Sequence, residues 1–224
     1  MSKSFSANKI REFHNKIKDD KNNRFNSWNY CYKEFKNVND NTDSLALNLA
    51  FYLASWGMYR GSSGLLQKDY KVHIKGVKII KNHYYLRCNE ESEISKKDIP
   101  NIMTLVEKLK EHYGNLYYLK NNDETKKITP TDTLISKILL GTLGCSPAFD
   151  RYFIDGVKSQ NLYFDKLSKK SFESLFIYLD KNYSEIETFQ NDMLKSENIY
   201  YPKLKIIDLY FWQEGFEKNN NNQK

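Results

Sequence analysis

The chain has 224 residues, of which 40% are apolar, and it carries a formal net charge of +7 with a pI near 9.0. This apolar content excludes a disordered chain and is enough for one substantial hydrophobic core. Helical apolar spacing with few Gly and Pro residues excludes a β-sandwich or barrel. We expect an all-α fold of about seven to nine helices, in a single compact domain over residues 1–216. A disordered polar tail is expected over 217–224.

The cysteines and histidines are too scattered for a zinc site, which needs a cluster of ligands. They are Cys31, Cys88, Cys145, His14, His73, His83 and His112. We therefore expect no metal and no cofactor. The first twenty residues are polar, and the apolar run from Leu45 to Tyr59 is shorter than the ~20 residues that span a bilayer. We expect a cytoplasmic protein with no membrane partner.

Apolar residues in the N-terminal part recur at helical spacing. Residues 6–20 predict an amphipathic helix, and Trp28 to Phe35 predict a second one. A third helix is expected from Asp43, as its N-cap, to about Tyr59. Polar residues are few in this third segment, so we expect both of its sides to be buried.

A break follows the third helix at Arg60, which is flanked by small residues up to Gly64. Arg60 with adjacent hydroxyl groups and backbone N–H groups would suit an anion, such as the phosphate of a nucleic acid. The alternative is that Ser62 or Ser63 caps the next helix while Arg60 pairs with a nearby acid. No phosphate-loop spacing is present to decide between them.

Four lysines in the next segment would form one stripe on a helix. They are Lys68, Lys71, Lys75 and Lys78. Leu66, Tyr70, His73, Val77 and Ile80 would line the opposite side. Gly76 weakens the helix prediction, so that a strand or short hairpin over residues 77–87 is the alternative. The stripe is a candidate for contact with nucleic-acid phosphates, or else a solvated helix face.

The remaining segments each show a start or stop signal for a helix. The expected features are a helix from Asp98 to Tyr113 that Gly114 ends, a polar link over 121–128, a helix capped by Ser168, a capping box of Ser184 and Glu187, and a last helix from Pro202 to Trp212 that Gly215 ends.

The stretch from Thr131 to Gly156 contains the most informative carboxylate. An apolar helix is expected there. Gly141 and Gly144 loosen its end, and Pro147 prevents it from continuing. Asp150 follows, where a new helix begins. It is either a catalytic carboxylate that the two helices hold rigidly, or an ordinary N-cap. Both interpretations predict that Asp150→Asn leaves stability nearly unchanged, because Asn caps a helix about as well.

Two runs in this stretch, Ser136-Lys-Ile-Leu and Pro147-Ala-Phe-Asp150, resemble a pattern of the helix-hairpin-helix DNA glycosylase superfamily. The run from Lys205 to Trp212 resembles its closing helix. The resemblance implies that Asp150 activates water or stabilises positive charge as a base leaves its sugar. The family's Leu-x-Gly-x-Gly turn, which grips DNA, is not matched by Thr142-Leu-Gly-Cys-Ser-Pro.

The neighbours of Asp150 have alternative roles. Lys137 is either a second functional group in the same cleft or a surface lysine, and we expect the surface position. Tyr152 and Phe153 either stack on an extruded base or belong to the core, as Trp56 and Trp212 do. The run from Phe51 to Ser63 is similar to stretches in uncharacterised bacterial proteins.

Three classes of function remain open. The first, which we expect, is a basic bacterial cytoplasmic protein that binds nucleic acid through the lysine stripe and Arg60. The second is a DNA glycosylase-like enzyme that uses Asp150. The third is a helical protein-interaction subunit without catalysis, whose positive charge meets an acidic protein partner.

Overall fold

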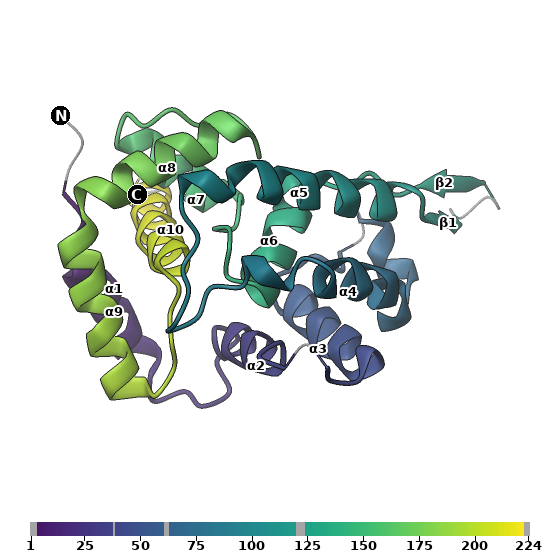
Figure 1. Cartoon of the computed structure of the whole chain (residues 1–224), viewed down its shortest axis with the longest axis horizontal. Coiled ribbons are helices and arrows are strands. Elements are labelled where there is room, and N and C mark those ends of the chain that lie inside the picture. Colours follow the sequence, from purple (N-terminus) through teal and green to yellow (C-terminus); the bar gives the residue numbers. More distant parts are fainter. Residues whose placement is uncertain (1–3, 38, 61–62, 120–123, 222–224) are drawn as a thin grey trace.

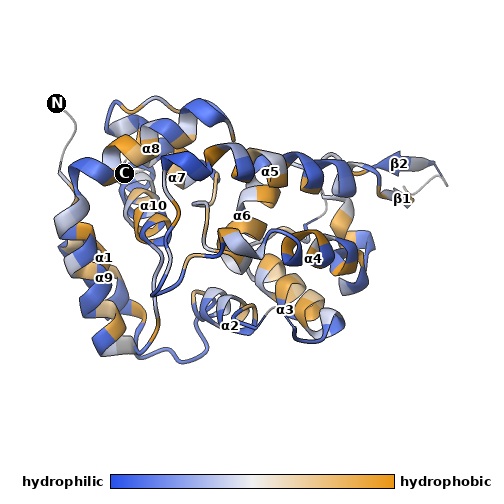
Figure 2. Cartoon of the chain, in the orientation of Figure 1, coloured by the Kyte–Doolittle hydropathy of each residue, from blue (hydrophilic) through white to orange (hydrophobic). Residues whose placement is uncertain are grey.

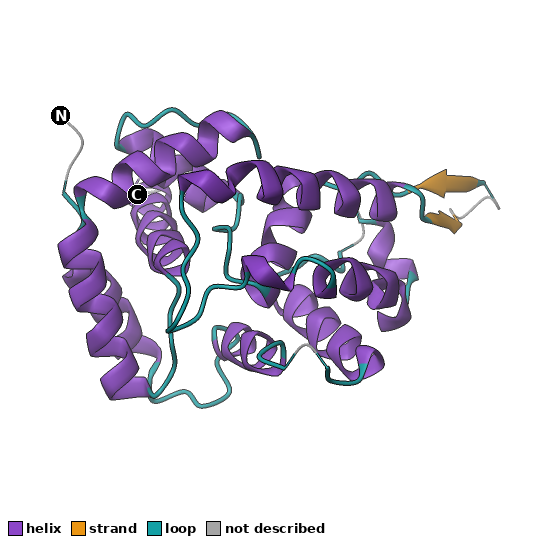
Figure 3. Cartoon of the chain, in the orientation of Figure 1, coloured by secondary structure: helices purple, strands orange, loops and turns teal. Residues whose placement is uncertain are grey.

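The computed structural model describes residues 4–37, 39–60, 63–119 and 124–221. Within these ranges the chain forms ten α-helices, four short 3-10 helices and one two-stranded antiparallel sheet (Figures 1 and 3). The mainly α fold is confirmed, with more helices than expected. The α-helices are α1 (Ala7–Ile17), α2 (Asn26–Glu34), α3 (Thr42–Ser55), α4 (Ile74–Lys81), α5 (Ile99–Gly114), α6 (Asp132–Thr142), α7 (Arg151–Ser159), α8 (Lys169–Lys181), α9 (Tyr183–Glu197) and α10 (Lys203–Asn221).

The short elements connect these helices. They are η1 (Gly64–Gln67), η2 (Tyr70–His73), η3 (Tyr84–Leu86), η4 (Lys96–Asp98), β1 (Tyr117–Leu119) and β2 (Thr125–Lys127). Buried apolar side chains from Phe5 to Phe211 form one hydrophobic core. Figure 2 shows the hydrophobic colouring along α3 and α6, which supply much of this core.

Helix α10 lies in the interior, among α1, α7 and α9 (Figure 1). Every residue from Tyr201 to Gly215 is buried. The expectation that Gly215 ends this helix is wrong, because α10 continues to Asn221. Residues 217–221 are therefore helical and not a disordered tail, while residues 222–224 lie outside the described part of the chain.

Gly215 instead allows α10 to touch α7. A Cβ atom on Gly215 would overlap the carbonyl oxygen of Tyr152, and one on Gly156 would overlap the carbonyl oxygen of Phe211. The two backbones therefore pack directly on each other, which glycine alone permits. This contact fixes α7, and with it Asp150 at its start, against the central helix.

The hairpin lies elsewhere than expected. Strands β1 and β2 pair Tyr117 with Lys127 and Leu119 with Thr125. The alternative of a strand or hairpin over 77–87 is wrong, since that segment contains α4 and η3. The link expected over 121–128 contains β2, and its residues 121–123 lie outside the described part of the chain. Gly76 does not break α4. A Cβ atom there would lie 2.9 Å from the hydroxyl oxygen of Tyr113, so this glycine makes room for a buried tyrosine on α5.

The N-cap of α3 differs from the expectation. Asn41 caps α3, since its side chain accepts a hydrogen bond from the backbone N–H of Asp43. The expectation that both sides of α3 are buried is also wrong. Leu47 is 53% exposed and Phe51 is 59% exposed.

The expected capping box at Ser184 and Glu187 is wrong as well. Glu187 accepts a hydrogen bond from the hydroxyl group of Tyr183 instead. A capping box is present before α5, between Ser95 and Asp98. The other expected caps are confirmed, since Ser168 caps α8 and Asp150 caps α7.

Candidate functional site

The segment between α6 and α7 places Asp150 at a fixed position. Thr131 caps α6 by accepting a hydrogen bond from the N–H of Leu134 at 3.1 Å. Gly144, with a φ of +67°, turns the chain after α6, as glycine readily does. Asp150 then caps α7, and its Oδ1 accepts from the N–H of Phe153 at 3.1 Å.

Side chains from α6 and α10 hold the turn before Asp150 on both sides. Ser136 Oγ accepts from the N–H of Phe149 at 2.7 Å, and Asp208 Oδ1 accepts from the N–H of Ala148 at 2.8 Å. Thr133 donates to the carbonyl oxygen of Phe149 at 2.8 Å. Three backbone groups of this buried turn are thus satisfied by side chains, which holds the turn in place.

Lys137 is buried and forms an ion pair with Asp150. Its Nζ lies 3.0 Å from Asp150 Oδ2, and the two side chains are 4% and 17% exposed. The same Nζ lies 4.8 Å from the ring centroid of Trp56. The expectation of a surface lysine is wrong. A carboxylate from the next helix and an aromatic face from the end of α3 offset the cost of burying the ammonium group.

A second buried ion pair lies beside the first one, on α10. Lys205 Nζ is 3.0 Å from Asp208 Oδ2, and 5.1 Å from the ring centroid of Trp28. Asp208 therefore joins a buried ammonium group to the turn before Asp150. Sequence reasoning missed this pair. Its signal was two opposite charges three residues apart on a helix that is otherwise apolar from Leu204 to Trp212.

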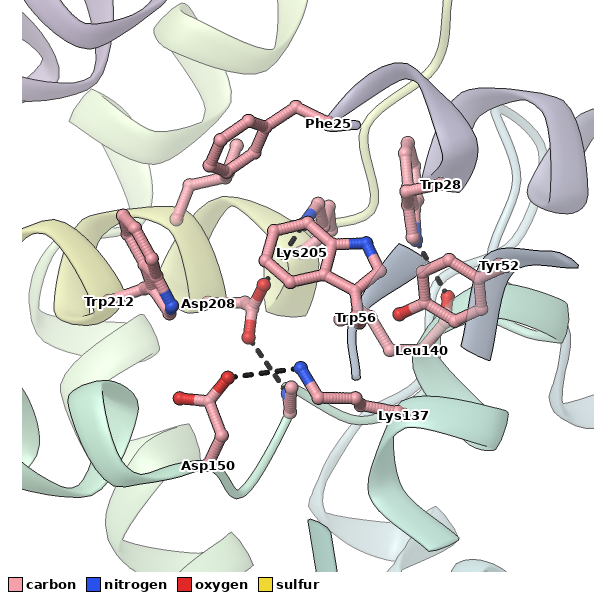
Figure 4. A pocket seen from close by; sticks show the side chains of 12 residues that line it. Phe25, Trp28, Tyr52, Trp56, Lys137, Leu140, Asp150, Lys205, Asp208 and Trp212 are labelled. Atoms are coloured by element: carbon pink, nitrogen blue, oxygen red, sulfur yellow. Dashed lines mark hydrogen bonds and ion pairs between the residues drawn. The ribbon is translucent and has the colours of Figure 1, made fainter. Parts of the chain in front are cut away.

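The two ion pairs line a small pocket with aromatic walls (Figure 4). Its walls include the rings of Phe25, Trp56 and Trp212. Phe25 lies edge-on to Trp56, with ring centroids 5.0 Å apart. The cavity measures about 20 Å³, which is room for about one water molecule. The indole Nε1 of Trp56 is buried and has no hydrogen-bond partner among the described residues.

An exposed cation lies beside two aromatic walls of this pocket, although it does not line the cavity itself. The guanidinium carbon of Arg24 is 5.1 Å from the ring centroid of Trp56 and 5.6 Å from that of Phe25. Arg24 is exposed and forms no ion pair with a carboxylate of the described ranges. Its charge is therefore available to a ligand that approaches the aromatic walls.

The residues that follow Asp150 have separate positions. Arg151 is exposed and contacts Asp155 and Asn219. Tyr152 packs edge-on against Trp212, with centroids 5.4 Å apart. Phe153 is fully buried in the core. Phe153 is therefore not available to stack on a base. Trp212 is buried, as expected, and Trp56 is half-buried, and both also line the pocket.

The lysine stripe does not belong to this pocket. Lys71, Lys75 and Lys78 are exposed and Lys68 is half-buried. They lie on η2, α4 and the residue after η1, so the single helix expected for them is wrong. On the opposite side His73, Val77 and Ile80 are buried, whereas Leu66 is exposed. Lys75 and Lys78 still share a face of α4, since they are three residues apart.

Arg60 is exposed and lines a different cavity, which lies between the hairpin and the start of α6. Ser63 caps η1 by accepting from the N–H of Leu65. This agrees with the capping alternative for Ser63, whereas Ser62 lies outside the described residues. Among the described residues, no carboxylate forms an ion pair with Arg60, and the pairing of Arg60 with a nearby acid stays a prediction.

Within the described ranges, no three or more His, Cys, Asp or Glu side chains gather as they would around a metal ion. No described helix combines the length and apolar character needed to cross a bilayer. Comparison of the chain with models of protein families, with curated proteins and with solved structures gave no match.

Proposed function

We propose that the protein binds nucleic acid and takes an unpaired base into the pocket between Phe25, Trp56 and Trp212. The observation that carries this proposal is the Lys137–Asp150 ion pair, buried against Trp56 at a pocket with aromatic walls and an exposed arginine beside it. The net charge of +7 would attract the phosphates of any nucleic acid.

Each part of this pocket matches one part of a nucleotide. Aromatic side chains stack on bases, with about 1–3 kcal/mol per base. A carboxylate and an ammonium group are an acceptor and a donor for the polar edge of the base. Arg24 is an exposed cation for the adjacent phosphate.

The pocket must widen to admit a base, because a cavity of about 20 Å³ holds about one water molecule. Arg24 lies over the ring of Trp56 in the closed arrangement. A phosphate that draws Arg24 away also uncovers that ring. Contact of Arg24 with the nucleic-acid backbone and opening of the pocket are therefore linked in this proposal.

A second candidate is a glycosylase-like enzyme, which the position of Asp150 favours. Its carboxylate is partly exposed and lies at a cavity with room for a water molecule. Oδ1 accepts the N-cap hydrogen bond and Oδ2 accepts from Lys137, so a remaining lone pair of Oδ2 would stabilise positive charge on the sugar or accept a proton from water. Lys137 would hold this carboxylate in place.

Changing the lysine stripe is expected to weaken binding to nucleic acids of any base sequence. Replacing Lys68, Lys71, Lys75 and Lys78 with Gln removes four cations, of which three are exposed. Because each lost phosphate contact lowers the slope of log K against log salt by about one, the slope should flatten by up to about four. The measurement is binding to labelled single-stranded and duplex DNA at several salt concentrations. Absence of binding at low salt in the wild type would rule out this role for the charge.

Arg24→Gln is expected to reduce both the salt dependence and the tryptophan signal of binding. The variant loses one phosphate contact, so the salt slope should fall by about one. Quenching of tryptophan fluorescence by single-stranded DNA should fall as well, since Arg24 lies over Trp56. Lys21→Gln is the matched control, an exposed cation three residues away. Equal effects of the two substitutions would contradict a specific role for Arg24.

A further inference from the structure

A second cavity lies at the N-terminal end of α6, at the base of the hairpin. It measures about 130 Å³, many times the ~10–15 Å³ that one water molecule needs. Four segments build it: the residues after α3, strand β1 through Tyr118, strand β2 with the residues that follow it, and the start of α6. Gly64 allows the close approach, because a Cβ atom there would meet the ring of Tyr118.

The described residues that line this cavity carry positive charge only. Arg60, Lys126 and Lys127 are among them, and none of the described lining residues is Asp or Glu. All three cations are exposed, and no described carboxylate pairs with them. Asp132, the nearest acid along α6, is engaged elsewhere. It pairs with Lys110 at 2.9 Å and accepts from the N–H of Leu167.

Hydroxyl groups complete the polar side of the cavity. The side-chain oxygens of Ser63 and Thr131 already accept hydrogen bonds from the N–H groups of Leu65 and Leu134. The hydroxyl protons of Ser63 and Thr131 therefore remain for donation to a ligand. Cations and hydroxyl donors are the groups that bind an oxyanion, and no carboxylate of the described lining competes for them.

The other side of the cavity is apolar. Met58, Ile128 and Leu134 are buried beneath it, and the ring of Tyr118 forms a wall. A free inorganic anion would leave this surface unused. The geometry points to a site for the phosphate group of a phosphorylated organic ligand, whose apolar part rests on Met58 and Tyr118. This inference stands apart from the aromatic pocket, since it requires no base between Trp56 and Trp212.

The phosphate could belong to a free mononucleotide or to the end of a nucleic-acid strand, and the test separates these sources. The probes are inorganic phosphate, adenosine monophosphate, and a short single-stranded DNA with either a phosphate or a hydroxyl group at its 5′ end. Binding is measured by calorimetry and by the shift of the melting temperature. The variant is Arg60→Gln with Lys126→Gln. The control is Lys170→Gln with Lys181→Gln, two exposed cations on α8, far from the hairpin (Figure 1).

We expect adenosine monophosphate to bind the wild type and the control equally well. The variant should bind it about tenfold more weakly or not at all, because it loses charge-assisted hydrogen bonds to the phosphate. Preference for the 5′-phosphorylated DNA would identify a strand end as the source. Equal affinity for both DNAs, with the mononucleotide still lost in the variant, would identify a free phosphorylated molecule. Failure of every phosphate probe to bind, or equal binding by variant and control, would overturn the inference.

Discussion

Asp150→Asn is expected to lower the free energy of unfolding by about 3 kcal/mol, although Asn preserves the helix cap. The cost arises at Lys137, whose side chain is 4% exposed and whose ammonium group would lose its counter-charge. Removing one partner of a buried pair is costly because the other charge stays buried. This result would replace the expectation, drawn from the sequence alone, that Asn is tolerated at this position.

The double substitution Asp150→Asn with Lys137→Met is expected to recover most of that loss, because no unpaired charge remains. Lys137→Met alone should cost less than Asp150→Asn, since Asp150 is partly exposed and still caps α7. Urea unfolding of the four proteins measures the coupling between the two residues. Equal instability of Asp150→Asn and the double variant would contradict the account, and so would additive effects.

Gly156→Ala is expected to destabilise the protein by about 3 kcal/mol or more. The added methyl group would overlap the backbone carbonyl of Phe211, and a backbone cannot rotate aside as a side chain can. Helices α7 and α10 would have to separate along the contact that positions Asp150.

Gly114→Ala is the matched control for this substitution. It adds the same methyl group to the last residue of α5, where the nearest atoms, on Pro130, lie at 3.7 Å. Because alanine favours helix and restricts the unfolded chain, this variant should be unchanged or slightly more stable. Comparable losses in both variants, by thermal or urea unfolding, would show that the close contact of α7 with α10 is not the cause.

Local signals were sufficient for most helices and for the cap at Asp150. The ends of α6 and α8 follow from Thr131, Ser168 and the apolar spacing, because capping and periodicity act within a few residues. Gly215 shows the limit of such signals. A glycine marks either a helix end or a close helix contact, and only the position of α7 distinguishes the two.

The pocket could not be predicted, because it depends on partners far apart in the sequence. Lys137 looks like a solvated lysine until Asp150 and Trp56 are placed beside it. Asp208 gains its role from a backbone N–H sixty residues away, at Ala148. The single helix predicted for the lysine stripe was wrong for a related reason, since the buried residues His73 and Val77 belong to two short helical elements and not to one long helix.

The base-binding proposal is tested most directly by photo-cross-linking with single-stranded DNA that carries one 5-iodouracil. This base couples to an aromatic side chain on which it is stacked, and mass spectrometry of the digested complex identifies the residue. We predict cross-links to Trp56 or Trp212, reduced in Arg24→Gln and retained in Lys21→Gln, because stacking in the pocket requires the arginine beside it. Cross-links confined to exposed aromatic residues elsewhere, such as Tyr85 or Tyr163, would contradict the proposal.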